Sequence, residues 1–361
     1  MIEKDKTIII GLMSGTSLDG LDIAACSFSD SSEGLKWQLL AAETVNYDSS
    51  WKEKLSSLPF ASAFDYALAS VELGRYMGEQ VKAFCARHAL APDYVASHGH
   101  TVFHRPELHL TTQIGDGDAL AAACGLPVIF NFRTLDVALG GQGAPLVPIG
   151  DRLLFSAYDA CLNLGGIANI SYGKDERTAF DISPCNMLLN FLARKGGKDY
   201  DDGGLLARQG TVIPSLLNKL DSLDYYSRPL PKSLGREWFD AECLPLVENS
   251  LSGNSLHDVM RTAVEHIAGQ IAAVLNKNGL HSLLATGGGA KNTFLIENLQ
   301  SIAPECQVAV PSADIVDFKE AIIFALLGYL RLCQRPNCLS SVTGAQQDNI
   351  GGQLSGLPPR S

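Results

Sequence analysis

Hydrophobic residues gather in short runs near the start of the chain, and small polar residues separate two of these runs. Ile8–Ile10 is a β-branched run typical of a buried strand. Residues 11–20 are rich in Gly, Ser and Thr, and apolar residues resume at Leu21–Phe28. This order predicts a β-hairpin, which differs from the strand–loop–helix of a P-loop.

The two halves of the chain show a similar order of patterns. Asp65–His88 has helical spacing of its apolar residues, and short strands are predicted at Tyr94–Ser97 and Pro127–Phe132. The second half begins with predicted strands at Ala160–Leu164, Ala168–Tyr172 and Thr178–Ile182. A helix, a strand and a glycine turn follow at Ser255–Asn276, Ser282–Thr286 and Gly287–Gly289. This repetition predicts two similar α/β lobes with a cleft between them.

The composition is that of a compact soluble protein and disfavours several classes of partner. The 361 residues include 28 Lys and Arg against 39 Asp and Glu, a net charge of −11. A negative surface disfavours nonspecific binding to nucleic acid and to anionic membranes. The longest apolar stretch, Ala321–Leu330, is shorter than the ~20 residues of a membrane span. The charged start, Met1–Lys6, is unlike a secretory signal, so we expect a cytoplasmic protein without nucleic-acid or membrane partners.

Two glycine-rich turns are the first candidates for ligand binding. In Gly11–Asp22, backbone N–H groups can converge on phosphate oxygens, and Asp19 and Asp22 are placed to hold Mg²⁺. An ordinary tight hairpin explains this motif equally well. In Gly287–Asn292, three successive glycines cost conformational entropy, which favours close contact with a ligand over a simple strand–helix turn.

Three further motifs carry chemistry that the pattern leaves open. Asp181 leaves an apolar strand and suits a general base, although an Asx-turn is the more common role in this pattern. Arg133 can bind a carboxylate or phosphate, or form an exposed pair with Asp136. Four histidines gather within twelve residues, at His98, His100, His104 and His109. Their spacing is not that of a zinc site, so we interpret them as part of a substrate-facing loop.

Ten sequence blocks occur in one order over nearly the whole chain. They are GLMSGTSLDGLD (11–22), SHGHTVFHRP (97–106), QIGDGDALA (113–121), GGQGAPLVP (140–148), NLGGIANIS (163–171), FDISPCNML (180–188), PKSLGREWF (231–239), TGGGAKN (286–292), KEAIIFALL (319–327) and SVTGA (341–345). This series resembles the anhydro-N-acetylmuramic acid kinases, the bacterial cell-wall-recycling branch of the sugar kinase/actin/heat-shock ATPase superfamily. Several blocks in a fixed order make the resemblance specific.

The resemblance implies an α/β, two-lobed actin-like (ribonuclease-H-like) ATPase fold with a nucleotide and sugar cleft between the lobes. The expected lobes are residues 1–130, joined by 341–361, and residues 131–340, with the change of domain near Gly140–Pro145. The tail Gly351–Ser361 is expected to be flexible. The implied reaction converts 1,6-anhydro-N-acetylmuramic acid, ATP and water into N-acetylmuramic acid 6-phosphate and ADP. A homodimer is also implied.

The same resemblance implies roles for individual residues. Asp181 matches the catalytic aspartate, which would deprotonate the water that opens the anhydro bridge. The ATP phosphates, with Mg²⁺, would contact Gly15, Thr16, Ser17, Leu18, Asp19, Gly20, Leu21 and Asp22. Mg²⁺ would be held by Asp19 and Asp22. The adenosine side would contact Gly287, Gly288, Gly289 and Asn292, and the sugar would lie near His98, Arg133, Gln142 and Glu320.

The chain departs from the family pattern at several positions. Ile182, Ser183, Cys185 and Asn190 replace Thr, Gly, Gly and Asp, and His100, Asn131 and Leu234 replace Gln, Asp and Thr. Ser183 and Cys185 add side chains where bare backbone is expected to approach phosphate. Two alternatives therefore stay open: a degenerate sensor that binds sugar or nucleotide without turnover, and a kinase for a different sugar.

Overall fold

The computed structural model describes residues 6–32 and 34–356, and the chain groups by its contacts into two compact units. Unit 1 comprises the residues up to Leu154 together with those from Phe318 onward, and unit 2 comprises Phe155–Asp317. Residues 131–154 and 318–340 group with unit 1, whereas the sequence analysis assigned both ranges to the second lobe.

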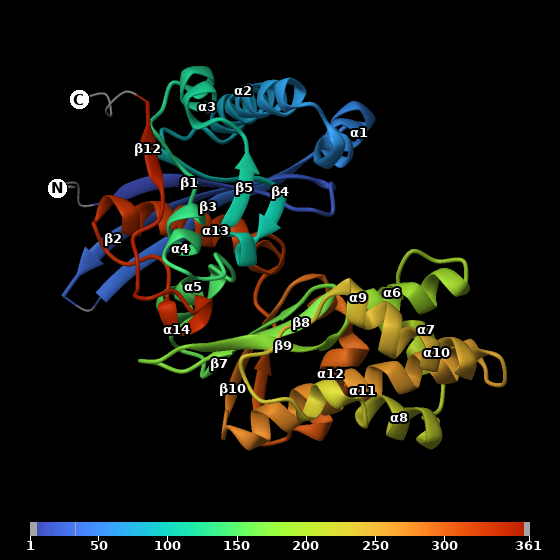
Figure 1. The fold of residues 1–361 in the computed structure, drawn as a ribbon. Helices are drawn as coiled ribbons and strands as arrows, with labels where there is room; N and C mark the ends of the chain where they lie inside the picture. Colours follow the sequence, from blue (N-terminus) through green and yellow to red (C-terminus); the bar gives the residue numbers. More distant parts are fainter. Residues whose placement is uncertain (1–5, 33, 357–361) are drawn as a thin grey trace. The chain divides into compact units, whose positions relative to one another are not determined.

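Unit 1 is built on a seven-stranded sheet with the order β12-β6-β4-β1-β2-β3, in which β5 pairs with β4 (Figure 1). β1, β2 and β3 form an antiparallel meander, and β4 is parallel to both β1 and β6. β5 and β12 run antiparallel to β4 and β6, respectively. The bounds are β1 Thr7–Ser14, β2 Gly20–Ser31, β3 Gly34–Asn46, β4 Tyr94–Arg105, β5 Leu110–Ile114, β6 Val128–Phe130 and β12 Gln353–Ser355.

Unit 2 contains a five-stranded sheet with the order β11-β10-β7-β8-β9. Its bounds are β7 Ala160–Leu164, β8 Ile167–Tyr172, β9 Thr178–Pro184, β10 Ser282–Thr286 and β11 Gln307–Ala309. β7, β8 and β9 form an antiparallel meander, β10 is parallel to β7, and β11 is parallel to β10. The order and directions match those of β1–β3, β4 and β6 in unit 1. This repeated topology is that of the two-lobed actin-like (ribonuclease-H-like) fold, so the predicted fold class is confirmed.

Helices flank both sheets (Figure 1). Those of unit 1 are α1 Ser49–Ser57, α2 Ala63–His88, α3 Gly117–Cys124, α4 Thr134–Ala138, α5 Val147–Leu154 and α14 Ser340–Thr343, and α13 Ala313–Leu332 begins in unit 2 and continues into unit 1. Those of unit 2 are α6 Asn186–Lys195, α7 Leu205–Arg208, α8 Pro214–Asp221, α9 Arg236–Trp238, α10 Leu244–Leu251, α11 Leu256–Lys277 and α12 Thr293–Ile302. Among the described residues, none of these helices is both long and apolar enough to cross a membrane.

The predicted long helices are confirmed, and each begins where a serine can cap it. α2 and α11 match the predicted ranges to within two residues, and the side chains of Ser62 and Ser255 each accept a hydrogen bond from a backbone N–H in the first turn. The first hairpin turn is shorter than predicted. β1 and β2 pair as far as Ser14 and Leu21, so the turn is confined to residues 15–19.

The predicted flexible tail is wrong for Gln353–Ser355, because these residues form β12 by pairing with β6. This strand forms its backbone hydrogen bonds with β6, which lies more than two hundred residues earlier in the sequence. No local pattern in the sequence predicts such a pairing. The remainder of the tail from residue 357 lies outside the described residues, as do residues 1–5 of the charged start.

Helix α13 packs directly on the backbone of β1. The side chains of Ile10 and Leu12 join the hydrophobic core beneath α2 and α3, so Gly11 between them faces the opposite side of the sheet. A Cβ atom at Gly11 would overlap the Ala321 carbonyl oxygen and lie 2.8 Å from the Ala325 amide nitrogen. Only glycine leaves room for this approach between the strand and the helix.

We expect Gly11→Ala to lower the free energy of unfolding by about 3 kcal/mol, because the methyl group must push α13 away from β1. Gly269→Ala in α11 is the matched control, since a Cβ atom there meets no atom within 4 Å. Helix propensity predicts that this control raises stability by up to about 1 kcal/mol. Denaturant unfolding measures both, and equal stability of the two variants would contradict the close packing at Gly11.

Candidate active site

The turn between β1 and β2 presents a short, exposed backbone segment. Thr16, Ser17 and Asp19 are exposed, and Leu18 adopts a left-handed φ of 60°. The Leu18 amide donates to the Gly15 carbonyl at 3.3 Å, and the Asp19 carbonyl accepts from the Tyr47 amide at 3.2 Å. This turn is the part of the predicted phosphate loop that is open to a ligand.

A buried hydrogen-bond chain supports the start of this turn. The Tyr47 hydroxyl donates to Ser14 Oγ at 2.9 Å, and Ser14 Oγ lies 3.0 Å from His100 Nδ1. Burial lowers the pKa of His100, which favours the neutral ring. Because the Ser14 hydroxyl accepts from Tyr47, it is able to donate its own proton to the neutral His100. The Gly11–Asp22 motif did not indicate that Ser14 or Tyr47 supports this turn.

His98 and Arg133, both expected near the sugar, contact each other directly. Arg133 Nε donates to His98 Nε2 at 3.0 Å, and Arg133 Nη1 donates to the Gly143 carbonyl at 2.6 Å. Since Nε2 of His98 accepts, Nδ1 carries the proton and donates to the Gly99 carbonyl at 3.0 Å. Burial, followed by the Arg133 charge, lowers the pKa of His98 well below its usual value. The alternative of an exposed pair between Arg133 and Asp136 is wrong, because Asp136 is fully buried.

Helix α13 brings Glu320 into the electrostatic environment of Arg133 and Asp22. Glu320 reaches solvent, yet surrounding protein atoms desolvate its carboxyl group and raise its pKa. The Arg133 charge acts against this rise, whereas the Asp22 carboxylate adds to it. Asp22 Oδ1 accepts from the Thr44 hydroxyl at 2.6 Å. Gln142, also predicted to contact the sugar, has an exposed side chain on the neighbouring glycine-rich loop.

Asp181 in unit 2 is a half-buried carboxyl group in the middle of β9, where it pairs with Asn169 of β8, rather than at the point where the chain leaves the strand. Its Oδ2 accepts from the Leu234 amide at 2.9 Å, and its backbone carbonyl accepts from the Tyr225 hydroxyl at 2.5 Å. Burial raises the pKa of Asp181, and the Leu234 hydrogen bond acts in the opposite direction. Because the effect of burial is the larger one, this carboxylate binds a proton more strongly than an exposed aspartate does, which suits a general base. Tyr225 and Leu234 were not predicted to contact it.

The side chains of Ser183 and Cys185 are fully buried, so neither occupies the solvent side of the turn after β9. Ser183 Oγ donates to the Pro184 carbonyl at 3.0 Å and lies 3.4 Å from the Tyr226 hydroxyl. Cys185 belongs to the hydrophobic core of unit 2. Whether backbone approaches phosphate at these two residues stays a prediction.

The Gly287–Gly289 turn packs against the end of β7 and the first residue of α6. A Cβ atom at Gly287 would overlap Asn163 Oδ1, and one at Gly289 would lie 2.8 Å from the Leu164 Cβ. Gly288 has more room, because only Asn186 Nδ2 comes within 4 Å of such an atom, at 3.8 Å. Close packing thus accounts for two of the three glycines. The sequence blocks that contain Asn163 and Asn186 give no local signal that either residue packs against this turn.

Asn292 has a structural role at the end of the same turn. It is buried, and its side chain caps α12 by accepting a hydrogen bond from the Leu295 amide at 3.0 Å. Its predicted contact with adenosine stays a prediction. The first two glycines of the turn are half-buried or exposed, whereas Gly289 is buried.

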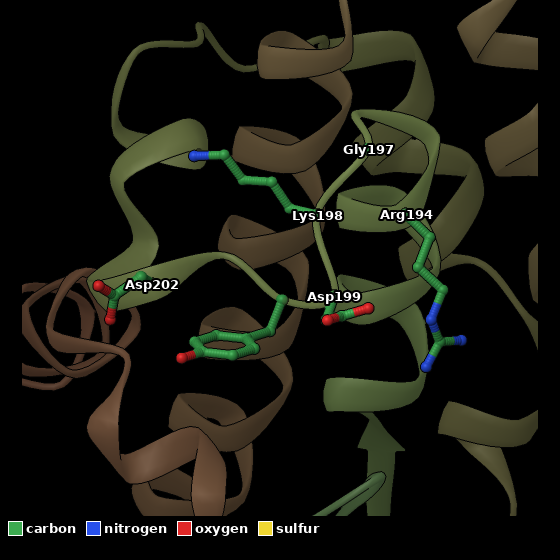
Figure 2. Close-up of a pocket in the computed structure, with 6 residues that line it drawn as sticks. Arg194, Gly197, Lys198, Asp199 and Asp202 are labelled. Atoms are coloured by element: carbon green, nitrogen blue, oxygen red, sulfur yellow. The ribbon is translucent and has the colours of Figure 1, made fainter.

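The predicted residues are divided between the two units. Unit 1 holds Gly15–Asp22, His98, Arg133, Gln142 and Glu320, and unit 2 holds Asp181, Gly287–Gly289 and Asn292. The described residues contain no group of three His, Cys, Asp or Glu side chains arranged for a metal ion. A pocket of about 420 Å³ lies elsewhere in unit 2, lined by Arg194, Gly197, Lys198, Asp199, Tyr200 and Asp202, and includes none of the predicted residues (Figure 2).

Comparison with known proteins gives one consistent family. A family model described as anhydro-N-acetylmuramic acid kinase matches residues 7–355. The protein of that name from Sulfurovum sp. (strain NBC37-1) is 36% identical over 360 residues, covering 96% of this chain and 99% of that protein. Its counterpart from Vibrio cholerae serotype O1 is 37% identical over 364 residues, covering 95% and 96%. A solved structure, the activator of the 2-hydroxyisocaproyl-CoA dehydratase from Clostridium difficile with bound ADPNP, matches with a TM-score of 0.45 at 12% identity, over 91% of this chain and 96% of that chain.

We expect His98 to remain neutral at pH values well below 6.5, the usual pKa of histidine, because burial and the Arg133 charge both oppose its protonation. Arg133→Met should raise the pKa of His98, while burial keeps it below the usual value. NMR titration of ¹⁵N-labelled histidine measures this pKa and reports which ring nitrogen carries the proton, and His98→Asn identifies the signal. Titration of His98 near pH 6.5 in both proteins would contradict the assigned hydrogen bonds.

Proposed function

The chain belongs to the anhydro-N-acetylmuramic acid kinase family, and from this premise we propose that it opens 1,6-anhydro-N-acetylmuramic acid with water and phosphorylates O6 with ATP. The products would be N-acetylmuramic acid 6-phosphate and ADP, in the recycling of cell-wall peptidoglycan. The single observation on this chain that supports the reaction best is Asp181, a half-buried carboxyl group held by the Leu234 amide.

In the proposed reaction, Asp181 accepts a proton from water as the water oxygen attacks C1 of the sugar. The C1–O6 bond breaks, and its electron pair stays on O6. O6 then attacks the γ-phosphorus of ATP, and the bond from phosphorus to the ADP oxygen breaks. The raised pKa of Asp181 supports this role, because an ordinary exposed aspartate has little affinity for the proton of water.

For the sugar, we propose contacts with Arg133, His98, Gln142 and Glu320. Arg133 has two guanidinium nitrogens, Nε and Nη1, fixed by His98 and Gly143, so that Nη2 is the group suited to bind the lactyl carboxylate. The neutral His98 adds no charge of its own to this site. The exposed side chain of Gln142 is a donor and acceptor for sugar hydroxyl groups.

For the nucleotide, we propose ATP with Mg²⁺, with the phosphates at the β1–β2 turn and adenosine at Gly287–Asn292. Asp19 is exposed in this turn and Asp22 lies at the start of β2, which matches the one or two carboxylates that usually bind Mg²⁺ together with phosphate oxygens and water. The metal would neutralise charge on the phosphates during transfer. The turn itself would present backbone N–H groups to them.

The sensor alternative is not favoured. It rested on the side chains of Ser183 and Cys185, and both are buried in the protein. A kinase for a different sugar is distinguished by the assay below. We also propose that the protein acts in the cytoplasm as a homodimer, as the family resemblance implies, and its net charge of −11 supports a soluble protein without a nucleic-acid partner.

With Mg²⁺ and ATP, the purified protein should release ADP only when 1,6-anhydro-N-acetylmuramic acid is present. In ¹⁸O-labelled water, the label should appear at C1 of the phosphorylated product, because water opens the bridge. A coupled ADP assay and mass spectrometry measure the two results. ADP release with free hexoses but not with the anhydro sugar would favour the different-sugar kinase. Nucleotide or sugar binding without any turnover would favour the sensor.

We expect Asp181→Asn to lower kcat at least about 10³-fold while ATP binding stays measurable, because the amide cannot accept the proton of water. Asp175→Asn, an exposed aspartate in the β8–β9 loop, is the control and should be unchanged. In the wild type, kcat should fall on the acid side with a midpoint above 3.8, since the working form is ionised and burial raises its pKa. A near-normal rate for Asp181→Asn would overturn the assignment of the base.

A further inference from the structure

Asp136 in helix α4 is a fully buried carboxylate on which three segments of unit 1 meet. Its Oδ2 accepts from the Gly143 amide at 2.7 Å. Its Oδ1 accepts from the Thr343 hydroxyl at 2.8 Å, the Asn349 side-chain amide at 2.9 Å and the Cys338 thiol at 3.0 Å. Four side-chain or backbone donors therefore converge on one carboxylate, which places the segment around residues 338–349 against the glycine-rich loop.

The loop held by Asp136 carries Gln142, one of the residues proposed to bind the sugar, and Gly143, which contacts Arg133. The Gly141 amide donates to the Asp136 backbone carbonyl at 2.9 Å, and a Cβ atom at Gly141 would overlap Asp136 Oδ2. The Gln142 amide donates to the Thr343 carbonyl at 2.8 Å. Each of the three loop residues Gly141–Gly143 thus has its backbone fixed by Asp136 or by the residue that Asp136 binds.

Arg133 receives its geometry from this loop. The Gly143 carbonyl accepts from Arg133 Nη1 at 2.6 Å, while the Gly143 amide is the group bound by Asp136. Gly143 therefore links the buried Asp136 carboxylate with the Arg133 guanidinium through its own amide and carbonyl groups. A shift of Gly143 would move one of the two contacts that orient Arg133 and leave only the contact with His98.

We infer that Asp136 is a positioning residue for the sugar: it holds Gly141–Gly143 so that the Arg133 guanidinium and the Gln142 side chain meet the ligand in one fixed geometry. This inference rests on the proposed function, because it assigns the orientation of groups proposed to bind that sugar. Asp136 itself is buried beneath the loop and acts through Gly143 and Thr343.

A carboxylate suits this position because all four partners on its side-chain oxygens are donors. An asparagine of the same shape would place N–H groups against at least one of these donors, and a buried donor without an acceptor is costly. The loop would then relax toward other hydrogen bonds. The expected consequence is a less well oriented Arg133 rather than the loss of a group that touches the sugar.

The test compares steady-state kinetics of the full-length wild type with Asp136→Asn. We expect KM for the anhydro sugar to rise at least about tenfold, with KM for ATP changed less than about twofold. A merely structural role would instead reduce the fraction of active protein, which lowers kcat per total protein and leaves KM unchanged. An unchanged KM for the sugar in soluble Asp136→Asn would overturn the inference.

Thr343→Val provides a milder variant if Asp136→Asn does not fold. It removes one hydroxyl donor to Asp136 at nearly constant volume, and KM for the sugar should rise about fivefold. Thr262→Val is the matched control, because Thr262 is also fully buried and hydrogen-bonded but lies in α11 of unit 2. It should lower thermal stability without changing KM for the sugar. Equal KM values for the two valine variants would overturn the inference.

A double-mutant cycle with Arg133→Lys tests whether Asp136 acts through Arg133. Once lysine has replaced the guanidinium, Asp136→Asn should raise KM for the sugar much less than it does in the wild type. Fully additive effects of the two changes would overturn the proposed route. The wild type is assayed in parallel, so absent turnover of the anhydro sugar would refute the proposed function, whereas normal wild-type turnover with unaffected variants would refute only this inference.

Discussion

The direct contact between helix α13 and strand β1 at Gly11 is the constraint on which the candidate site of unit 1 depends. Because no side chain separates them, the helix lies on the strand that leads into the β1–β2 turn. The buried ion pair between Lys319 and Asp151, 2.7 Å apart, fixes the same part of the helix. Glu320, the next residue, is consequently held where the charges of Asp22 and Arg133 influence its pKa.

The two units share one topology, and in each unit one candidate turn lies where the first strand of the meander ends. In unit 1, Ser14 at the end of β1 supports the phosphate-loop candidate together with His100 of the parallel strand β4. In unit 2, Asn163 and Leu164 at the end of β7 contact the glycine turn that follows the parallel strand β10. Parallel neighbours bring their carboxyl ends to one edge of a sheet, so residues distant in sequence become adjacent there.

The sequence predicted the long helices, most strands, the fold class and the family, because periodicity and ordered motifs are local signals. It did not predict β12, whose pairing partner is remote, or the burial of Asp136, whose four donors come from two other segments. The triple glycine was interpreted as a ligand contact, but packing against Asn163 and Leu164 accounts for two of its members. The burial of the Ser183 side chain was likewise not predicted, and one of its contacts, the Tyr226 hydroxyl, comes from a segment 43 residues away.

The division of the chain between the units has a consequence for synthesis on the ribosome. Unit 2 is one continuous segment, so most of its sheet and core are available before the last segment has emerged. Unit 1 cannot complete its fold until residues 343–355 have been synthesised. β12 forms the edge of its sheet, and Thr343 and Asn349 donate hydrogen bonds to Asp136. Three of the four hydrogen-bond donors to Asp136 are thus among the last groups to be synthesised, and until they pack, this side chain has only the Gly143 amide as a partner from this set.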